Sequence, residues 1–144
     1  MPRREGGVPE RLFVDSGAWV AFFSARDGRH ADADRSFREA IRQKVPLLTS
    51  NLVLAEVHRL LLFRAGIRAA ATALERIDAS PSVTVKFADM SVHRQARAWL
   101  AKLGDQVITY TDAASFALMQ ANRCTVALSF DRDFAIAGYT LWNG

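Results

Sequence analysis

The chain has 144 residues, of which 50% are hydrophobic and 24% charged, and it carries a formal net charge of +4 at pH 7. This length suits one domain, and the composition excludes a disordered or collagen-like chain. No apolar run approaches the roughly 20 residues of a membrane-spanning helix and no signal-peptide pattern follows the basic N-terminus, so we expect a cytoplasmic protein without membrane contact.

A lead-in rich in Gly and Pro precedes short β-type runs that alternate with helical patterns. We interpret residues 1–10 as a flexible N-terminal extension and residues 11–144 as a single domain. In chain order the expected elements are a strand at 11–15, helices at 16–25 and 30–44, a strand at 46–50, helices at 51–65 and 67–78, a strand at 82–87, helices at 91–103 and 111–123, and strands at 124–130 and 139–143.

Strands that alternate with helices predict an α/β fold in which a parallel sheet is covered on both faces. The nearly continuous apolar run at 124–130 supports this fold, because a strand buried on both faces is apolar throughout. It contains the single cysteine, Cys124, which we expect to be a small buried apolar residue. In open sheets of this kind, ligands bind beyond the carboxyl ends of the strands.

Acidic residues stand at the ends of the expected strands and near the starts of the expected helices. Asp15 ends the first strand, and Asp131 and Asp133 follow the apolar strand. Asp112 lies at the start of a helix, and Glu56 lies on or beside the apolar stripe of another. These positions predict that several carboxylates gather at one edge of the sheet.

Each acid also has a local structural interpretation. Asp15 can accept N–H groups at the start of the following helix, and Asp112 can interact favourably with a helix macrodipole. Glu56 can pair with Arg59, three residues further along the same helix. The two acids after the apolar strand are typical turn formers. These alternatives stay open for each residue taken singly.

Taken together, the acids predict a metal site. Crowded carboxylates raise one another's pKa unless a cation is present. Hard oxygen ligands select Mg²⁺ or Mn²⁺ rather than zinc. The chemistry that follows is metal-assisted hydrolysis of a phosphodiester bond, which indicates a nuclease.

The order and setting of these acids resemble the PIN domain, most closely the VapC-like toxins of bacterial toxin–antitoxin pairs. The matching stretches are LFVDSGAWVAFF, LTSNLVLAEVHRLL, YTDAASFALMQANRCTVALSFDRDF and AGYTLW. The resemblance implies a three-layer α/β/α sandwich around a central, mostly parallel sheet. The site residues that it implies are the catalytic and metal-binding quartet Asp15, Glu56, Asp112 and Asp131, with Asp133, Ser16 and Thr111 as auxiliary neighbours.

The same resemblance implies a Mg²⁺- or Mn²⁺-dependent endoribonuclease that cleaves structured RNA, such as transfer or ribosomal RNA, and acts as a toxin. It also implies a homodimer and a cognate antitoxin whose tail lies across the active-site groove. The extension at residues 1–10 departs from the family pattern but removes no site residue.

Basic residues give a weaker indication of RNA binding. Arg132, between two acids, can meet a substrate phosphate or pair with those acids. A basic stretch around the second helix is typical of a solvated face, with RNA backbone contact as the alternative. This stretch consists of Arg26, Arg29, Arg35 and Arg38.

Two other functions compete with the nuclease. A phosphatase would use Asp15 as a nucleophile, but it usually has a second acid two residues further on, where this chain has Gly17. A non-catalytic PIN-like RNA-binding or scaffold module would have no reason to keep four mutually repelling acids. The sequence contains no glycine-rich phosphate loop, which disfavours nucleotide-driven enzymes.

Overall fold

The computed structural model describes residues 7–144. Its elements are β1 (Leu12–Val14), α1 (Ser16–Phe23), α2 (His30–Arg42), β2 (Leu47–Ser50), α3 (Asn51–Ala65), α4 (Ile67–Ala79), β3 (Val83–Lys86), α5 (Met90–Lys102), α6 (Tyr110–Ala121), β4 (Val126–Leu128), α7 (Asp133–Ile136) and β5 (Thr140–Leu141). Residues 1–6 of the expected extension lie outside the described residues. Val8, near its end, is half-buried against the core.

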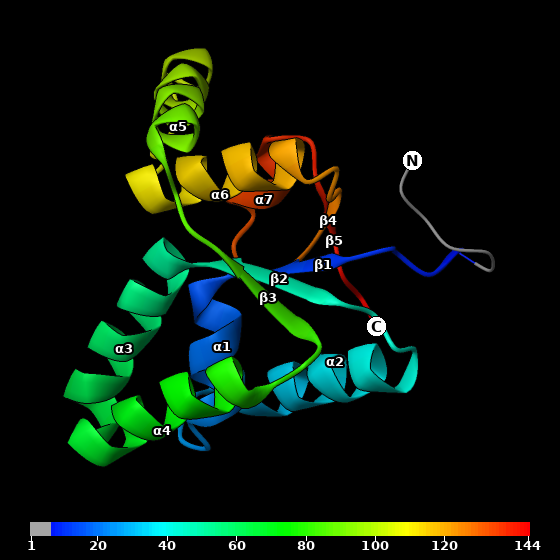
Figure 1. Ribbon diagram of the computed structural model, residues 1–144, viewed down its shortest axis with the longest axis vertical. Helices are drawn as coiled ribbons and strands as arrows, with labels where there is room; N and C mark the ends of the chain where they lie inside the picture. The colour runs from blue at the N-terminus through cyan, green and yellow to red at the C-terminus, as the bar shows by residue number, and fades with distance from the viewer. Residues whose placement is uncertain (1–6) are drawn as a thin grey trace.

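The strands form one sheet in the order β3-β2-β1-β4-β5, and each neighbouring pair is parallel. Helices α1 to α4 cover one face of this sheet and α5 to α7 cover the other (Figure 1). The expected α/β/α sandwich with a central parallel sheet is therefore confirmed. Because all strands run in the same direction, their carboxyl ends share one edge.

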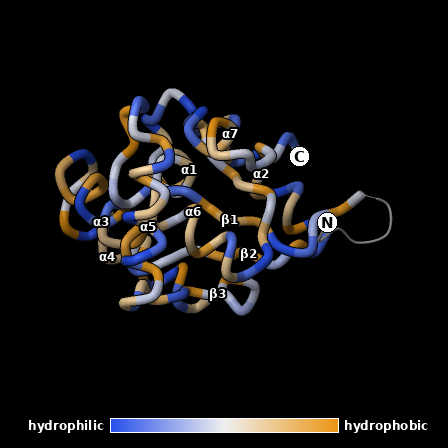
Figure 2. Tube along the Cα trace, turned by 90° about the horizontal axis from the view of Figure 1, so that it is seen from above, coloured by the Kyte–Doolittle hydropathy of each residue, from blue (hydrophilic) through white to orange (hydrophobic). Residues whose placement is uncertain are grey.

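The middle strand of the sheet forms the centre of the hydrophobic core. Leu12, Phe13 and Val14 of β1 are fully buried, which is expected for a strand with a partner on each side and helices on both faces. In Figure 2 hydrophobic stretches run along β1 and β2, inside the surrounding helices. Among the described residues, no helix is both long and apolar enough to cross a membrane.

Helix α6 is buried almost all round, which accounts for its run of small residues. Every side chain from Asp112 to Met119 is buried. Ala113, Ala114 and Ala117 pack against α5, while Phe116 belongs to the main core beneath the helix. Small side chains let α6 lie close both to the sheet and to α5. Its first turn, and Asp112 with it, is thereby held in a fixed place.

At the end of the chain, the observed helices and strands differ in detail from the predicted ones. The strand expected over 124–130 is shorter, because β4 ends at Leu128 and Phe130 lies in the following turn. Helix α7 was missed, since four residues are too few to show a helical period. It is held in place by Phe134, whose buried ring packs against Phe13 and Phe116. Cys124 is buried, as expected.

Candidate functional site

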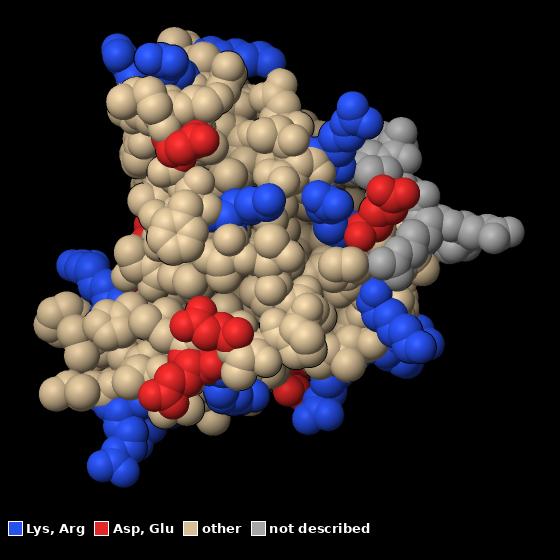
Figure 3. Space-filling view, viewed as in Figure 1, with Lys and Arg blue, Asp and Glu red and all other residues tan. Residues whose placement is uncertain are grey.

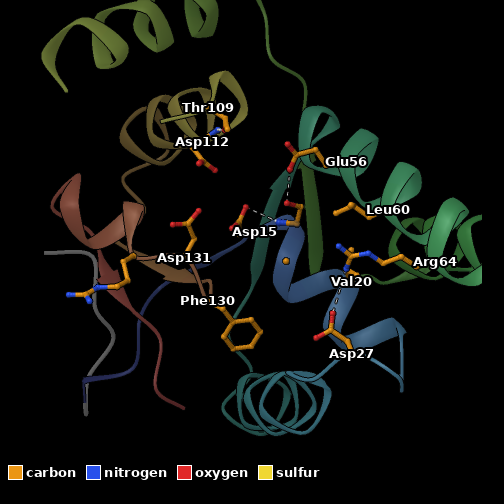
Figure 4. A pocket seen from close by; sticks show the side chains of 13 residues that line it. Asp15, Val20, Asp27, Glu56, Leu60, Arg64, Thr109, Asp112, Phe130 and Asp131 are labelled. Carbon is orange, nitrogen blue, oxygen red and sulfur yellow. Dashed lines mark hydrogen bonds and ion pairs between the residues drawn. The ribbon is translucent and has the colours of Figure 1, made fainter. Parts of the chain in front are cut away.

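A cleft of about 670 Å³ opens at the carboxyl edge of the sheet. Its walls come from the ends of β1 and β4 and from helices α1, α3 and α6 (Figure 4). The residues that line it are Asp15, Ser16, Gly17, Val20, Asp27, Glu56, Leu60, Arg64, Thr109, Asp112, Phe130, Asp131 and Arg132.

Three of the predicted acids converge in this cleft. Carboxylate oxygens of Asp15, Asp112 and Asp131 all lie within 4.8 Å of one another, and Figure 4 shows the three side chains facing the same space. They come from the end of β1, the first turn of α6 and the turn after β4. The parallel sheet and the position of α6 thus bring together residues that are almost 120 positions apart in sequence.

Asp15 is fixed by hydrogen bonds at both carboxylate oxygens. Its Oδ1 accepts the N–H of Ser16 (2.8 Å), and its Oδ2 accepts the hydroxyl of Ser129 (3.0 Å). The pKa of Asp15 is raised to about 6, mainly by burial and also by the neighbouring charges of Glu56 and Asp131, while the two hydrogen bonds act in the opposite direction. The expected helix-capping role is real, and it coexists with a place in the acidic cluster.

Asp112 lies in the first turn of α6, which Thr109 caps. The Thr109 hydroxyl accepts the N–H of Asp112 (3.1 Å), and Figure 4 shows the Asp112 carboxylate facing the cleft. Burial raises the pKa of Asp112 to about 7, with further contributions from the charges of Asp15 and Asp131. Carboxyl groups with pKa values raised in this way are concentrated at functional sites.

The turn after β4 organises the remaining two aspartates. The N–H of Asp131 donates to the Ser129 hydroxyl (3.0 Å), and Asp131 Oδ1 accepts the N–H of Asp133 (2.9 Å). Burial raises the pKa of Asp133, and the charge of Asp131 adds to the effect. Asp133 is therefore close to the cluster but outside the three-residue group.

Glu56 reaches the same cleft from the second turn of α3. Its carboxylate accepts a hydrogen bond from the Ser16 hydroxyl (2.6 Å). The guanidinium carbon of Arg59 lies instead over the ring of Phe63, 5.9 Å from the ring centroid. The expected ion pair with Arg59 is thus replaced by a hydrogen bond to α1. Ser50 caps α3 by accepting the N–H of Val53 (3.1 Å), which fixes the start of this helix.

Some of the other predicted residues line the cleft and others lie outside it. Ser16 lines the cleft and bonds Glu56, but the hydroxyl that α6 contributes to the lining is that of Thr109 rather than Thr111. Arg132 also lines the cleft. On α2, Arg35 pairs with Asp32 (2.9 Å) and Arg38 pairs with Asp34 (2.8 Å). Those two pairs agree with the solvated face that the sequence predicts.

Sequence reasoning missed several residues of the site. Ser129 connects Asp15 to the Asp131 turn, and Thr109 caps α6. Asp27 and Arg64 form an ion pair in the cleft (Oδ2 to Nη1, 3.9 Å). A hydroxyl near the end of the otherwise apolar run at 124–130 was an available signal for Ser129. Nothing local in the sequence links Asp27 to Arg64.

The chemistry of the cluster fits a divalent metal. Three carboxylates supply only oxygen donors, which Mg²⁺ and Mn²⁺ prefer. Burial and mutual repulsion disfavour the charged forms of Asp15 and Asp112, and a bound cation reverses that preference. Asp15, Asp112 and Asp131 would hold the ion, with Glu56 at the edge of the set.

We expect the variant Ser129→Ala to bind Mn²⁺ about tenfold more weakly, since groups that orient metal ligands typically contribute 10- to 100-fold. The change removes one of the two hydrogen bonds that fix the Asp15 carboxylate and the hydroxyl that anchors Asp131. A titration of thermal stability with Mn²⁺ measures the affinity. Ser82→Ala, an exposed position, is the control, and equal affinities for the two variants would contradict the assigned role.

Comparisons with known proteins bear on this geometry. The model of the PIN domain matches residues 12–138. The 23S rRNA-specific endonuclease VapC20 of Mycobacterium tuberculosis is 37% identical over 129 residues, which cover 89% of this chain and 95% of the relative.

Two solved structures are also similar. The crystal structure described as that of Mycobacterium tuberculosis VapC20, a sarcin–ricin loop cleaving toxin, has a TM-score of 0.80 at 37% identity and covers 90% of this chain and 96% of its own. The crystal structure of FitAcB from Neisseria gonorrhoeae has a TM-score of 0.66 at 15% identity. It covers 92% of this chain and 96% of its own. The second likeness supports the fold alone.

Proposed function

Because the chain belongs to the PIN-domain family, we propose that it is a metal-dependent endoribonuclease that acts as the toxin of a toxin–antitoxin pair. The resemblance to VapC-like toxins expected from sequence is confirmed by a relative of 37% identity that matches over almost the whole chain. The observation that carries the proposal is the convergence of the Asp15, Asp112 and Asp131 carboxylates in one cleft.

The residues of the cleft have distinct roles in the proposed reaction. Asp15, Asp112 and Asp131 hold the cation. Ser129 orients Asp15 and Asp131 through its hydroxyl hydrogen bonds. Glu56, held by Ser16, completes the acidic set directly or through a water molecule. Bound Mg²⁺ or Mn²⁺ supplies a water of lowered pKa and neutralises charge on the phosphate. We propose Mg²⁺ as the native ion, with Mn²⁺ as a substitute.

The competing phosphatase reaction is disfavoured by the surroundings of Asp15. A second acid two residues further on is absent, because Gly17 lines the cleft there. The proposed role of Asp15 is therefore to bind the cation rather than to form a covalent intermediate.

The relative suggests a substrate. VapC20 is described as specific for 23S rRNA and as cleaving the sarcin–ricin loop, and we propose the same loop as the substrate of this chain. Because ribosomal RNA is the proposed substrate, we also propose a cytoplasmic location. The proposal includes a homodimer and a cognate antitoxin that blocks the cleft.

Mapping of cleavage sites tests this function. The purified chain is incubated with a synthetic sarcin–ricin hairpin and with a hairpin of scrambled loop sequence, each with Mg²⁺, Mn²⁺ or Ca²⁺. We expect a single cut within the native loop, with Mg²⁺ or Mn²⁺, at a rate at least tenfold above that for the scrambled loop. Intact RNA in every reaction would overturn the proposed activity, and equal cutting of both hairpins would overturn the proposed substrate.

A further inference from the structure

Acidic charge dominates the cleft even when a metal ion is present. Five carboxylates and two guanidinium groups line it, so the acids remain in excess after the addition of one divalent cation. A polyanion such as RNA therefore needs positive groups placed along its path. On the face shown in Figure 3, Lys and Arg side chains are scattered rather than gathered into one patch. The arginines inside the cleft are consequently the first candidates.

We infer that Arg64 forms a subsite for a backbone phosphate of the RNA, next to the phosphate that is cleaved. This inference rests on the proposed function. Arg64 follows Glu56 and Leu60 at intervals of four residues on α3, and all three side chains line the cleft. The separation of eight positions between Glu56 and Arg64 corresponds to about 12 Å along the helix axis. One face of α3 thus presents an acid at the metal end of the cleft and a cation at the far end.

Asp27 holds the guanidinium group at that far end. In the loop between α1 and α2, Asp27 Oδ1 accepts the N–H of Arg29 (2.8 Å), which leaves Oδ2 directed at Arg64 Nη1 (3.9 Å). The backbone of Asp27 is fixed by hydrogen bonds to Ser24 and His30. Because the Arg64 side chain is 58% exposed, it keeps donors free for a ligand.

The floor between the two ends of the cleft is low and uncharged. It is formed by Gly17, Val20 and Leu60, and Figure 4 shows Leu60 between Glu56 and Arg64. A Cβ atom at Gly17 would meet no atom within 4 Å, so the path is open. A strand whose scissile phosphate lies at the acids can continue across this floor and reach Arg64 with its next phosphates.

Replacement of Arg64 tests the subsite. We expect Arg64→Gln to raise the KM for the sarcin–ricin hairpin about tenfold, because a charge-assisted phosphate contact is lost, while kcat stays within about twofold. In RNA binding measured by fluorescence anisotropy in Ca²⁺, the slope of log affinity against log salt concentration falls by about 1. Arg64→Lys keeps the charge, and is expected to restore that slope and most of the affinity.

Arg59→Gln is the matched control, because it removes the same charge from the same helix. Arg59 lies about 140° away from Arg64 around the helix axis, and its side chain lies over the ring of Phe63. We expect the control to match the parent chain in KM and salt slope. If Arg64→Gln and Arg59→Gln behave alike, the subsite is overturned. Cleavage by the parent chain reports on the proposed function separately, and anisotropy compares the variants whether or not the RNA is cut.

Discussion

Replacement of Asp112 by asparagine is expected to reduce RNA cleavage by about 10²- to 10³-fold, the scale observed when a group that stabilises transition-state charge is removed. Asparagine preserves the shape of the side chain but removes the charge that binds the cation. Asp112 is one of three residues whose carboxylate oxygens lie within 4.8 Å of one another, and its first-turn position is set by the Thr109 cap. The loss can therefore be assigned to chemistry rather than to misfolding.

Stability provides the control for this variant. Without metal the Asp112 carboxylate is repelled by Asp15 and Asp131, so Asp112→Asn is expected to unfold about 3 °C higher than the parent at pH 8, equivalent to about 1 kcal/mol. Asp78→Asn, at an exposed position on α4, is expected to leave both cleavage and stability unchanged. An Asp112→Asn variant that cleaves at the parental rate would remove Asp112 from the active site.

The positions of the acids in the fold could be predicted from sequence because a parallel sheet has one carboxyl edge. Asp15 and Asp131 follow strands β1 and β4, which are neighbours in the sheet. Asp112 begins the helix that precedes β4 along the chain. A reading of strand ends and helix starts was thus sufficient to bring three acids into one cleft, although each also has the local structural role that the sequence offered as an alternative.

The contacts that orient these acids could not be predicted in the same way. The Ser16–Glu56 and Ser129–Asp15 hydrogen bonds join residues 40 and 114 positions apart. Whether such bonds form depends on atomic positions to within a few tenths of an ångström. The pair of Asp27 and Arg64 depends on the path of the loop between α1 and α2. Hydrophobic periodicity contains no information on such distances, so the sequence indicated which acids meet but not which hydroxyl groups hold them.

Removal of divalent metal is expected to abolish cleavage and to make stability depend on pH. The pKa of Asp15 is raised to about 6 and that of Asp112 to about 7, above the value of about 3.9 expected in the unfolded chain. The metal-free folded chain therefore binds more protons than the unfolded chain between about pH 4 and pH 7. Its free energy of unfolding therefore falls as the pH rises through that range.

Addition of metal should reverse this loss, because the cation binds the ionised carboxylates of the folded chain. At 100 times its dissociation constant, an ion that binds only the folded state adds about 2.7 kcal/mol, and the increase should be larger at pH 8 than at pH 5, where protons compete for the same oxygens. Thermal unfolding with EDTA and with Mn²⁺ at both pH values measures this. Metal-free stability that increases from pH 5 to pH 8, or an effect of Mn²⁺ that persists unchanged in Asp112→Asn, would contradict a cation site at Asp15, Asp112 and Asp131.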